Sequence, residues 1–340
     1  MNSSNKNIIP IFYAIDKNYL PYLAVSLSSL KDNIRSNYIY KVYILHSNVS
    51  KEEQEVILSY NSLNFHVSFI NISDRLHEIN SDIKLRDYYT NTTYYRIFIA
   101  DLFLEYDKAI YLDSDTIVLN DIADLYNYDI DDYLVGAIND QVVNTSPVFS
   151  KYSLEVLGIN ANEYFNAGVL LINLKEFRNI NFYKIFCSLL KIYKFHVAQD
   201  QDYLNVICKN RVKLLPISWN IMPTCNNNIK EPNLIHYNLT AKPWHYENIP
   251  YAEYFWKYAK DNYYYELIKN SLDNYNEIDR QNDINTENNL IKLAKNEINK
   301  NNNFYHIINK IFGEDYDVLD TIQFNKLNNY CNKFILDLRR

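Results

Sequence analysis

The stretch AIYLDSDTIVL, residues 109–119, decides how the rest of the chain is interpreted. Its apolar run ends at Leu112 and is typical of a buried strand. Asp113 and Asp115 follow where that strand ends, with one residue between them. In an extended backbone alternate side chains lie on the same face, so both carboxylates could face one hard cation. Aspartate is also common in turns, and so short a motif arises often by accident. The pair alone therefore leaves a turn and a metal site open.

Strand-like apolar runs alternate with helical patterns over the first two-thirds of the chain. The expected strands are residues 8–15, 41–47, 65–72, 109–112, 133–140 and 164–174. Helical patterns cover residues 20–34, a segment that begins near residue 50, and residues 92–105 and 200–210. This alternation predicts an α/β sheet with helices on both faces.

The composition changes in the last part of the chain. Residues 275–303 are rich in Asn, Glu, Lys and Asp, which predicts an exposed helix or a loosely ordered connector. Amphipathic spacing returns over residues 319–338. We therefore expect a main domain over residues 1–270, followed over residues 271–340 by an Asn-rich connector and an amphipathic helical extension.

Composition and charge exclude several classes of function. The formal charge is -7 and the Lys and Arg residues are scattered, which argues against binding of nucleic acid. The four cysteines, Cys187, Cys208, Cys225 and Cys331, have no paired spacing of the zinc or redox kind and fit a reducing compartment. The sequence shows no secretory signal pattern and no apolar stretch long enough to span a membrane, so we expect a cytoplasmic protein.

Residues 234–246, LIHYNLTAKPWHY, offer further ligands for a metal bound to the aspartate pair. His236 ends a short apolar run, although a lone histidine is more often structural than a ligand. Two carboxylates and one imidazole suit Mn²⁺ better than Mg²⁺, which prefers oxygen ligands and keeps its waters. Lys242 follows six residues after His236. An ammonium beside a metal, in a chain of negative charge, indicates a bound diphosphate.

Seven stretches of the chain resemble glycosyltransferase family 8, and they occur in the order found in that family. They are AIDKNYLPYLAVSLSSL, TTYYRIFIADLF, YLDSDTIVL, YFNAGVLLINLKEFR, DQDYLNVI, NIMPT and HYNLTAKPWH. The resemblance is strongest to bacterial retaining galactosyl- and glucosyltransferases that build lipooligosaccharide and related glycans. It spans roughly residues 8–258, and the final stretch of the chain has no part in it.

The resemblance implies a GT-A fold, in which a Rossmann-like mixed sheet binds a UDP-sugar at the carboxyl ends of its strands. It further implies that Asp113, Asp115 and His236 bind Mn²⁺, with Mg²⁺ as the alternative. The metal would bridge the donor diphosphate and stabilise the charge on departing UDP. Ser114, between the two aspartates, is assigned to the donor on the same ground.

The same resemblance assigns the other residues of the site. The donor set is Ala14 and Asp16 near uracil, Asn18 near the ribose, Tyr19 against the base, Arg96 and Lys242 at the diphosphate, Asn166, Ala167 and Gly168 at the sugar, Asp200 at the sugar hydroxyls, and Leu239 in the phosphate loop. Lys242 would neutralise the diphosphate from the side opposite the metal. Gln201 would lie beneath the anomeric carbon, and Asp140 would face the acceptor.

Ordinary structural explanations remain open for most of these residues. They are a helix cap for Asn18, the positive end of a helix for Asp200 and Asp202, a polar loop for Asp140, a plain helix arginine for Arg96 and a solvated surface lysine for Lys242. Gly168 is more informative, because glycine within a strand usually marks close backbone approach or a bulge and this chain has only 4 glycines.

One position departs from the pattern of the family. Many relatives carry glycine three residues after the metal-binding histidine, where a backbone N–H approaches the diphosphate, but this chain has Leu239. A leucine can donate that N–H only if the loop does not require positive φ. The departure also supports an alternative function, a UDP-sugar-binding partner subunit that has lost turnover. A nucleotidyltransferase is a third alternative, but the glycine-rich basic loop expected after the first strand is absent from AIDKNYLPYL.

The predicted reaction moves glucose or galactose from UDP-glucose or UDP-galactose to a hydroxyl of a glycan or glycolipid, with retention at the anomeric carbon. Retention usually implies a carboxylate nucleophile, but the amide of Gln201 is a poor one. We therefore expect front-face departure of UDP, with the amide oxygen stabilising the oxocarbenium-like centre and a diphosphate oxygen taking the acceptor proton. A glycosyl adduct on Asp200 is the alternative.

Related enzymes often use a carboxyl-terminal segment to approach membranes. Here the last residues balance bases and acids, Lys326, Lys333, Arg339 and Arg340 against Asp315, Asp317, Asp320 and Asp337. Anionic lipid favours a basic amphipathic face instead. We therefore expect this segment to pack on the main domain or on another subunit of a homo-oligomer. Peripheral association with the inner face of the cell membrane rests on the resemblance alone.

Overall fold

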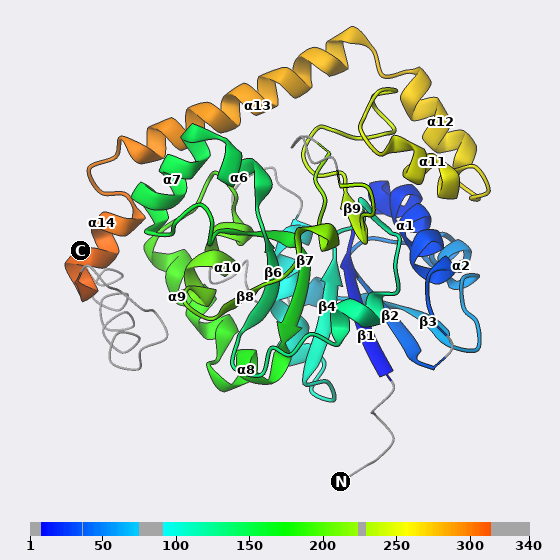
Figure 1. The fold of residues 1–340 in the computed structure, drawn as a ribbon, viewed down its shortest axis with the longest axis horizontal. Coiled ribbons are helices and arrows are strands. Elements are labelled where there is room, and N and C mark those ends of the chain that lie inside the picture. The colour runs from blue at the N-terminus through cyan, green and yellow to red at the C-terminus, as the bar shows by residue number, and fades with distance from the viewer. Residues whose placement is uncertain (1–7, 36, 75–90, 224–228, 314–340) are drawn as a thin grey trace.

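A seven-stranded mixed sheet forms the centre of the structure (Figure 1). The computed structural model describes residues 8–35, 37–74, 91–223 and 229–313. In spatial order the strands are β3 (Phe65–Asn71), β2 (Ile39–His46), β1 (Ile8–Ala14), β4 (Lys108–Leu112), β7 (Phe165–Asn173), β6 (Val135–Asn139) and β8 (Val212–Leu214). The first four run parallel to one another, whereas β7 is antiparallel to both β4 and β6. The predicted α/β sheet is confirmed, and its carboxyl-terminal edge becomes the place to look for a ligand site.

Side chains that alternate along the central strands build a core on each face of the sheet. In β4, Ala109 and Tyr111 enter one core, while Ile110 and Leu112 enter the other. Every residue of β7 is buried, as expected for a strand covered on both faces. The alternation follows from the two-residue period of a strand.

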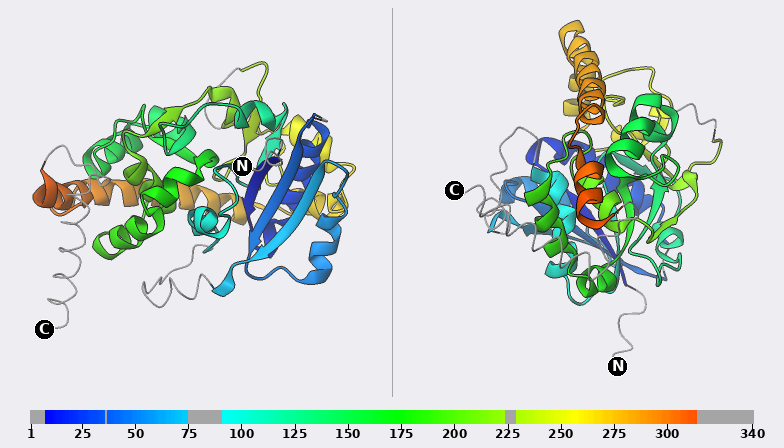
Figure 2. Two further views of the ribbon diagram at one scale, coloured as in Figure 1. Left: turned by 90° about the horizontal axis from the view of Figure 1, so that it is seen from below. Right: turned by 90° about the vertical axis from the view of Figure 1, so that its left-hand side faces the viewer.

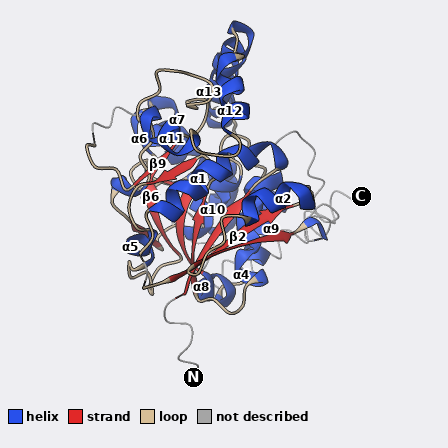
Figure 3. Ribbon diagram, turned by 90° about the vertical axis from the view of Figure 1, so that its right-hand side faces the viewer, coloured by secondary structure: helices blue, strands red, loops and turns tan. Residues whose placement is uncertain are grey.

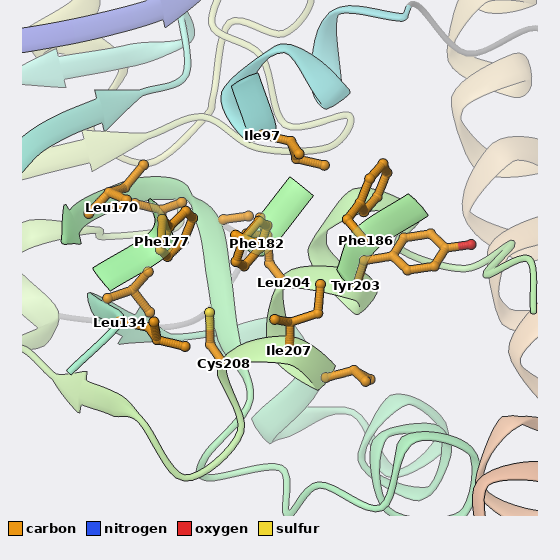
Figure 4. Packing of buried hydrophobic residues seen from close by; sticks show 14 of the residues in the cluster. Ile97, Leu134, Leu170, Phe177, Phe182, Phe186, Tyr203, Leu204, Ile207 and Cys208 are labelled. Carbon is orange, nitrogen blue, oxygen red and sulfur yellow. The ribbon is translucent and has the colours of Figure 1, made fainter. Parts of the chain in front are cut away.

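Helices cover both faces of the sheet (Figure 3). One core contains residues of α1 (Leu20–Asp32), α2 (Lys51–Leu58) and α5 (Ile122–Tyr126). The other contains residues of α4 (Ile99–Leu102), α7 (Pro147–Leu157), α8 (Leu174–Asn179), α9 (Phe182–Ile192) and α10 (Asp200–Cys208). Figure 4 shows part of this second core, in which the rings of Phe177 and Phe182 stack with their centroids 4.0 Å apart.

A second, small sheet brings two distant segments together beside β4. It pairs β5 (Thr116–Val118) with β9 (Leu234–His236), and Thr116 lies opposite His236. Its apolar side chains pack with those of α11 (Ala252–Ala259) and α12 (Tyr265–Asp273). The short helices η1 (Lys17–Tyr19), η3 (Ile217–Trp219) and α6 (Gln141–Thr145) complete the connections around this end of the sheet.

The helix expected over residues 92–105 is wrong in type and length. Residues Asn91–Phe98 form the 3₁₀ helix η2, and a single α-helical turn, α4, ends at Leu102. Threonine and tyrosine dominate the start of η2, and both are weak helix formers. The tighter 3₁₀ winding also lets the Nε of Arg96 donate to the carbonyl of Thr93, three residues earlier.

The carboxyl-terminal region is helical as far as the structure describes it. Helix α13 (Glu277–Ile298) runs along the outside of the molecule from α12 to α7, and α14 (Phe304–Phe312) follows (Figures 1 and 2). At 1.5 Å per residue α13 is about 33 Å long. An exposed helix was one of the two predicted alternatives for this segment, and it is confirmed. The division of the chain at residue 270 stays a prediction, and the amphipathic run over residues 319–338 lies outside the described residues.

Two further expectations concern cysteines and membranes. Neither Cys187 nor Cys208 forms a disulfide within the described part of the chain, and Cys225 and Cys331 lie outside it. Among the helices in the described part of the chain, none combines the length and apolar character that a membrane crossing requires.

The side chain of Asn205 in α10 holds β7 against that helix through hydrogen bonds, and a variant at this position tests their contribution to stability. Its Oδ1 accepts from the backbone N–H of Phe165, and its Nδ2 donates to the carbonyls of Phe165 and Gln201, all at 2.8 to 2.9 Å. Asn205→Ala leaves buried backbone groups unpaired and should lower the free energy of unfolding by about 2 to 4 kcal/mol. Urea titration measures this loss. Asn288→Ala, on the exposed part of α13, should change it by less than about 1 kcal/mol. Equal effects of the two variants would contradict this account.

Candidate active site

A turn, rather than extended strand, brings the aspartate pair together. Asp113, Ser114 and Asp115 connect β4 to β5, and the Oγ1 of Thr116 donates to the carbonyl of Asp113 at 2.8 Å. The Nε2 of His236 lies 3.7 Å from Oδ2 of Asp113 and 3.3 Å from Oδ1 of Asp115. One ligand atom from each of the three residues lies within 4.8 Å of the other two. The predicted grouping of two carboxylates and one imidazole is therefore present.

Asn220 orients the imidazole of His236. Its Oδ1 lies 3.1 Å from Nδ1 of His236 and accepts a hydrogen bond from it, which leaves Nε2 directed at the carboxylates. The Nδ2 of Asn220 donates to Oδ1 of Asn166 at 3.0 Å, which ties the histidine to β7. Supporting contacts of this kind commonly orient the ligands of metal sites. This role of Asn220 was not predicted from the sequence, although the residue begins the stretch NIMPT.

Gly168 leaves the space that the cluster occupies. A Cβ at this position would lie 2.2 Å from Cε1 of His236 and 2.7 Å from Oδ2 of Asp113. The carbonyl of Gly168 accepts from the N–H of Asp113 at 2.8 Å, so the backbone of β7 lies directly beneath the pair. The expected close approach of the backbone at this glycine is confirmed.

Two buried cations neutralise the pair from different sides. Arg96 donates to the carbonyl of Ala167 and lies 3.2 Å from Asp113 and 3.1 Å from Asp200. Lys242 donates to Oδ2 of Asp115 and to a backbone carbonyl. Burial would raise the pKa of Asp115, but Lys242 and His236 hold that pKa well below its usual range.

Burial decides between the alternatives for these two cations. Arg96 and Lys242 are 5% and 6% exposed, so the plain helix arginine and the solvated surface lysine are both wrong. The ammonium of Lys242 contacts Asp115, one of the candidate metal ligands. Its expected place across a diphosphate from the metal stays a prediction.

Gln201 is held in one orientation by four hydrogen bonds. Its Oε1 accepts from the N–H of Ala167 at 2.9 Å and from Nδ2 of Asn166 at 3.2 Å. Its Nε2 donates to Oδ2 of Asp140 at 3.0 Å and to the hydroxyl of Tyr164 at 3.2 Å. A backbone N–H requires an acceptor and a carboxylate requires a donor, so these partners determine which end of the amide is which. The predicted grouping of Asp140, Asn166 and Gln201 is present, while Tyr164 was missed.

Two buried aspartates flank Gln201 at the start of α10. Asp200 pairs with Arg96, whereas Asp202 accepts from the hydroxyls of Tyr152 and Tyr164 at 2.8 and 2.7 Å. Burial raises the pKa of each aspartate to about 6. Both lie in the first turn of α10, so their place at the positive end of a helix is confirmed. Asp202 also accepts from the N–H of Ala198.

Two cavities meet at the aspartate pair. One, of about 170 Å³, lies between the end of β1, η2 and the turn after β4. The other, of about 270 Å³, extends past Gly168 and Gln201 toward α6, α7 and α13. Both are lined by Thr93, Arg96, Asp113 and Asp115. An elongated ligand with one charged centre could therefore occupy both cavities, with its charge at the junction.

The smaller cavity contains most of the residues assigned to the nucleoside. Ala14, Asp16, Tyr19 and Ser114 line it, and the hydroxyl of Thr93 beside them is buried without a hydrogen-bond partner. Asn18 is exposed and is not among the lining residues. The alternative role of Asn18 as a helix cap is wrong, because Asp16 caps η1 by accepting from the N–H of Asn18 at 2.8 Å, while the contact of Asn18 with a ribose stays a prediction.

Leu239 adopts the backbone conformation that glycine would provide. Its φ is 54°, in the left-handed region, and its side chain is 47% exposed. For a residue with a Cβ this conformation costs about 1 to 2 kcal/mol. A leucine was expected to donate its N–H here only if the loop did not require positive φ, and the loop does have positive φ at Leu239. The loop nevertheless keeps the conformation, and Leu239 lines the larger cavity.

Taken together, a sheet of this topology with an acidic cluster at the end of β4 defines an α/β enzyme of the GT-A class. The sequence model of Glycosyl transferase family 8 matches residues 10–248, and the chain belongs to this family. A putative glycosyltransferase of Haemophilus influenzae is 31% identical over 69% of this chain and 72% of its own. A lipopolysaccharide 1,2-glucosyltransferase of Escherichia coli K12 is 25% identical over 77% and 80%.

A solved structure supports the same assignment. The galactosyltransferase LgtC, in complex with donor and acceptor sugar analogs, is 27% identical and has a TM-score of 0.64. The similarity covers 75% of this chain and 96% of that one. The GT-A fold and a glycosyltransferase activity are therefore established at the level of the family.

Gly168 provides a direct test of the cluster's geometry. In Gly168→Ala the new methyl group displaces His236 or Asp113, so we expect the affinity for Mn²⁺ to fall at least tenfold. Isothermal titration calorimetry measures it. Gly136→Ala in β6 is the control, since its Cβ would lie 3.1 Å from the side chains of Ile130 and Leu215, away from the cluster. That variant should lose stability and keep its Mn²⁺ affinity. Unchanged Mn²⁺ binding by Gly168→Ala would contradict the proposed ligand set.

Asp202 should leave a signature in the dependence of stability on pH. Its pKa rises from 3.8 in the unfolded chain to about 6, so the folded protein binds this proton more tightly. Its contribution to stability therefore decreases between about pH 4 and pH 6, by up to about 1.4 kcal/mol per unit, and is level above. We expect the stability difference between wild type and Asp202→Asn to change over this window in urea titrations. For Asp132→Asn, at an exposed position, the difference should be flat. A flat difference for Asp202→Asn would refute the assignment.

Proposed function

We propose that the chain is a retaining hexosyltransferase that moves glucose or galactose from a UDP-sugar to a hydroxyl of a glycan. The observation that carries the proposal is the meeting of two cavities at the cluster of Asp113, Asp115 and His236. A UDP-sugar has this shape, since its diphosphate lies between two ring systems. The nucleoside would take the smaller cavity and the sugar the larger one.

The residues of the cluster fit a divalent cation. Oδ1 of Asp115 is buried without a hydrogen-bond partner, and Gly168 leaves room where any larger residue would not. A set of two carboxylates and one imidazole favours Mn²⁺ over Mg²⁺. A bound cation would act as a Lewis acid for the charge that develops on the leaving diphosphate.

Arg96 and Lys242 extend this electrostatic environment to the donor phosphates. Both are buried and positively charged, and both already contact carboxylates of the cluster. If Asp113, Asp115 and His236 held a cation, Arg96 and Lys242 would lie beside it and could donate to phosphate oxygens. Donors held in place before the reaction cost little reorganisation when charge develops.

Gln201 is suited to stabilise positive charge at the anomeric carbon, and it is not suited to form a covalent bond. Its oxygen is fixed by Ala167 and Asn166, and amides are weak nucleophiles. Both oxygens of Asp140 already accept N–H donors, from Val143 on one side and from Asn166 and Gln201 on the other. Asp140 is thereby a poor general base, which supports transfer of the acceptor proton to a diphosphate oxygen on the same face.

Relatives narrow the proposed substrates without choosing the sugar. The Escherichia coli relative is named a lipopolysaccharide glucosyltransferase, and LgtC is a galactosyltransferase. We propose lipopolysaccharide or a similar glycolipid as the acceptor class, with the reaction at the cytoplasmic side of the membrane. Glucose and galactose both remain candidates, because they differ by one hydroxyl configuration.

Donor hydrolysis tests the proposed function. With Mn²⁺ and a series of UDP-sugars, without acceptor, we expect slow release of UDP from UDP-glucose or UDP-galactose. In Gln201→Ala the release and transfer rates should fall by about tenfold to a thousandfold with donor binding intact, because the stabilising amide oxygen is lost. A coupled UDP assay and calorimetry provide the two readouts.

The control is Gln281→Ala, at an exposed position on α13, which should behave as wild type. Undiminished rates in Gln201→Ala would remove the role of the amide. Binding of a UDP-sugar without release of UDP from any donor would instead favour the alternative of a partner subunit without turnover.

A further inference from the structure

The larger cavity has an apolar side that the proposed chemistry does not use. This side is lined by Val142 and Val143 of α6, by Phe149 of α7, by Val197 before α10, and by Leu290 of α13. The polar groups that line the same cavity include Asp140, Asn166 and Gln201. One cavity therefore offers carboxylate and amide groups together with a hydrophobic surface, which is the usual composition of a site that binds an organic ligand.

Helix α13 is held in place at both ends of the site. Toward its start, Glu287 bonds the hydroxyl of Thr240, in the loop that follows His236. Asp283 accepts from the hydroxyls of Tyr246 and Tyr275 at 2.7 and 2.6 Å. Toward its end, Ala294 belongs to the core that contains α7, and Ile298 packs against that core. The helix therefore spans the site between two anchored ends (Figure 1). In the sequence, Leu290 lies between the residues that make these contacts.

This helix lies outside the residues that the family model matches. The match ends at residue 248, and α13 begins at Glu277. The described residues that line the smaller cavity, assigned to the nucleoside, fall within 14–115. Among the described residues beyond 248, Leu290 alone lines either of the two cavities. A contribution of α13 thus concerns the larger cavity, where the acceptor would approach the donor sugar.

We propose that α13 forms a wall of the acceptor subsite and that Leu290 helps to determine which acceptor is used. This inference rests on the proposed function and deepens it. The acceptor is a saccharide that places the apolar C–H face of a pyranose ring against Leu290, Phe149 and Val143. Its hydroxyl groups at the ring edge then point toward Asp140 and Gln201. Hydroxyl groups leave the ring faces with patches of C–H bonds, and burial of such a patch is favourable.

The test compares acceptor use with donor hydrolysis. Wild type and Leu290→Asp receive UDP-glucose or UDP-galactose with Mn²⁺, together with a panel of methyl glycosides of hexoses, hexosamines and heptoses. We expect the acceptor KM of Leu290→Asp to rise at least tenfold. Release of UDP without acceptor is measured alongside, and we expect it to change by a smaller factor than the acceptor KM, because Leu290 does not line the smaller cavity. Leu290→Met, which keeps an apolar surface, should retain transfer and shift the preference among glycosides.

Ile298→Ala is the matched control for packing of the helix. Ile298 is half-buried, packs against the same core and does not line the cavity. If loosened packing of α13 explains the effect at Leu290, Ile298→Ala will raise the acceptor KM as well, and the proposal is overturned. An unchanged acceptor KM and profile in Leu290→Asp also overturns it.

The outcomes separate this inference from the proposed function. A wild type that hydrolyses donor but transfers to no saccharide overturns the acceptor wall and leaves the donor site standing. A wild type that binds a UDP-sugar and never releases UDP contradicts the proposed function, and with it the inference that depends on it.

Discussion

The repulsion between Asp113 and Asp115 is the constraint around which this end of the molecule is organised. Two carboxylates within 4.8 Å repel each other by about 3 to 4 kcal/mol at an effective dielectric constant of 20. Burial adds a further cost for each charge that is left without a partner. Arg96 and Lys242 supply the compensation, one to each carboxylate. The two cations balance the charge of the aspartate pair closely enough for the protein to fold, while one face of the pair stays available to a ligand.

This arrangement explains local features that would otherwise be unfavourable. The glycine at 168 weakens the interior of β7, yet a side chain there would overlap the imidazole of His236. The 3₁₀ winding of η2 is less favourable than an α-helix, yet it carries the buried guanidinium that serves Asp113 and Asp200. The pairing of β5 with β9 holds His236 against the turn that carries the aspartates. The glycine in β7 and the 3₁₀ winding of η2 are therefore unfavourable locally, but both are needed for the charged side chains to come together.

The sequence predicted the fold well where periodicity is strong, and it identified residue types better than their contacts. Strands β1, β4 and β7 follow from their apolar runs, and Gly168 follows from its rarity. Two supporting partners were not predictable, because Asn220 reaches His236 and Tyr164 reaches Gln201 only through tertiary structure. The helix expected over residues 92–105 is present only as a 3₁₀ helix and one α-helical turn, because Thr and Tyr at its start are weak helix formers. The exposed position of Asn18, which the resemblance places near the ribose, was not predictable either, because it depends on the local turn that Asp16 caps.

The left-handed conformation of Leu239 bears on whether the site is maintained for catalysis. A loop released from a functional constraint would be free to relax, since a leucine with φ of 54° is strained. The loop instead keeps this conformation between His236 and Lys242, two residues that contact Asp115. Thr240, the next residue, is tied to α13 through Glu287. The strain is thus sustained by contacts at both ends of the loop, which connects the charged cluster to the helix that lies over the larger cavity. The charged cluster and α13 are in this way connected by direct contacts, although they come from distant parts of the chain.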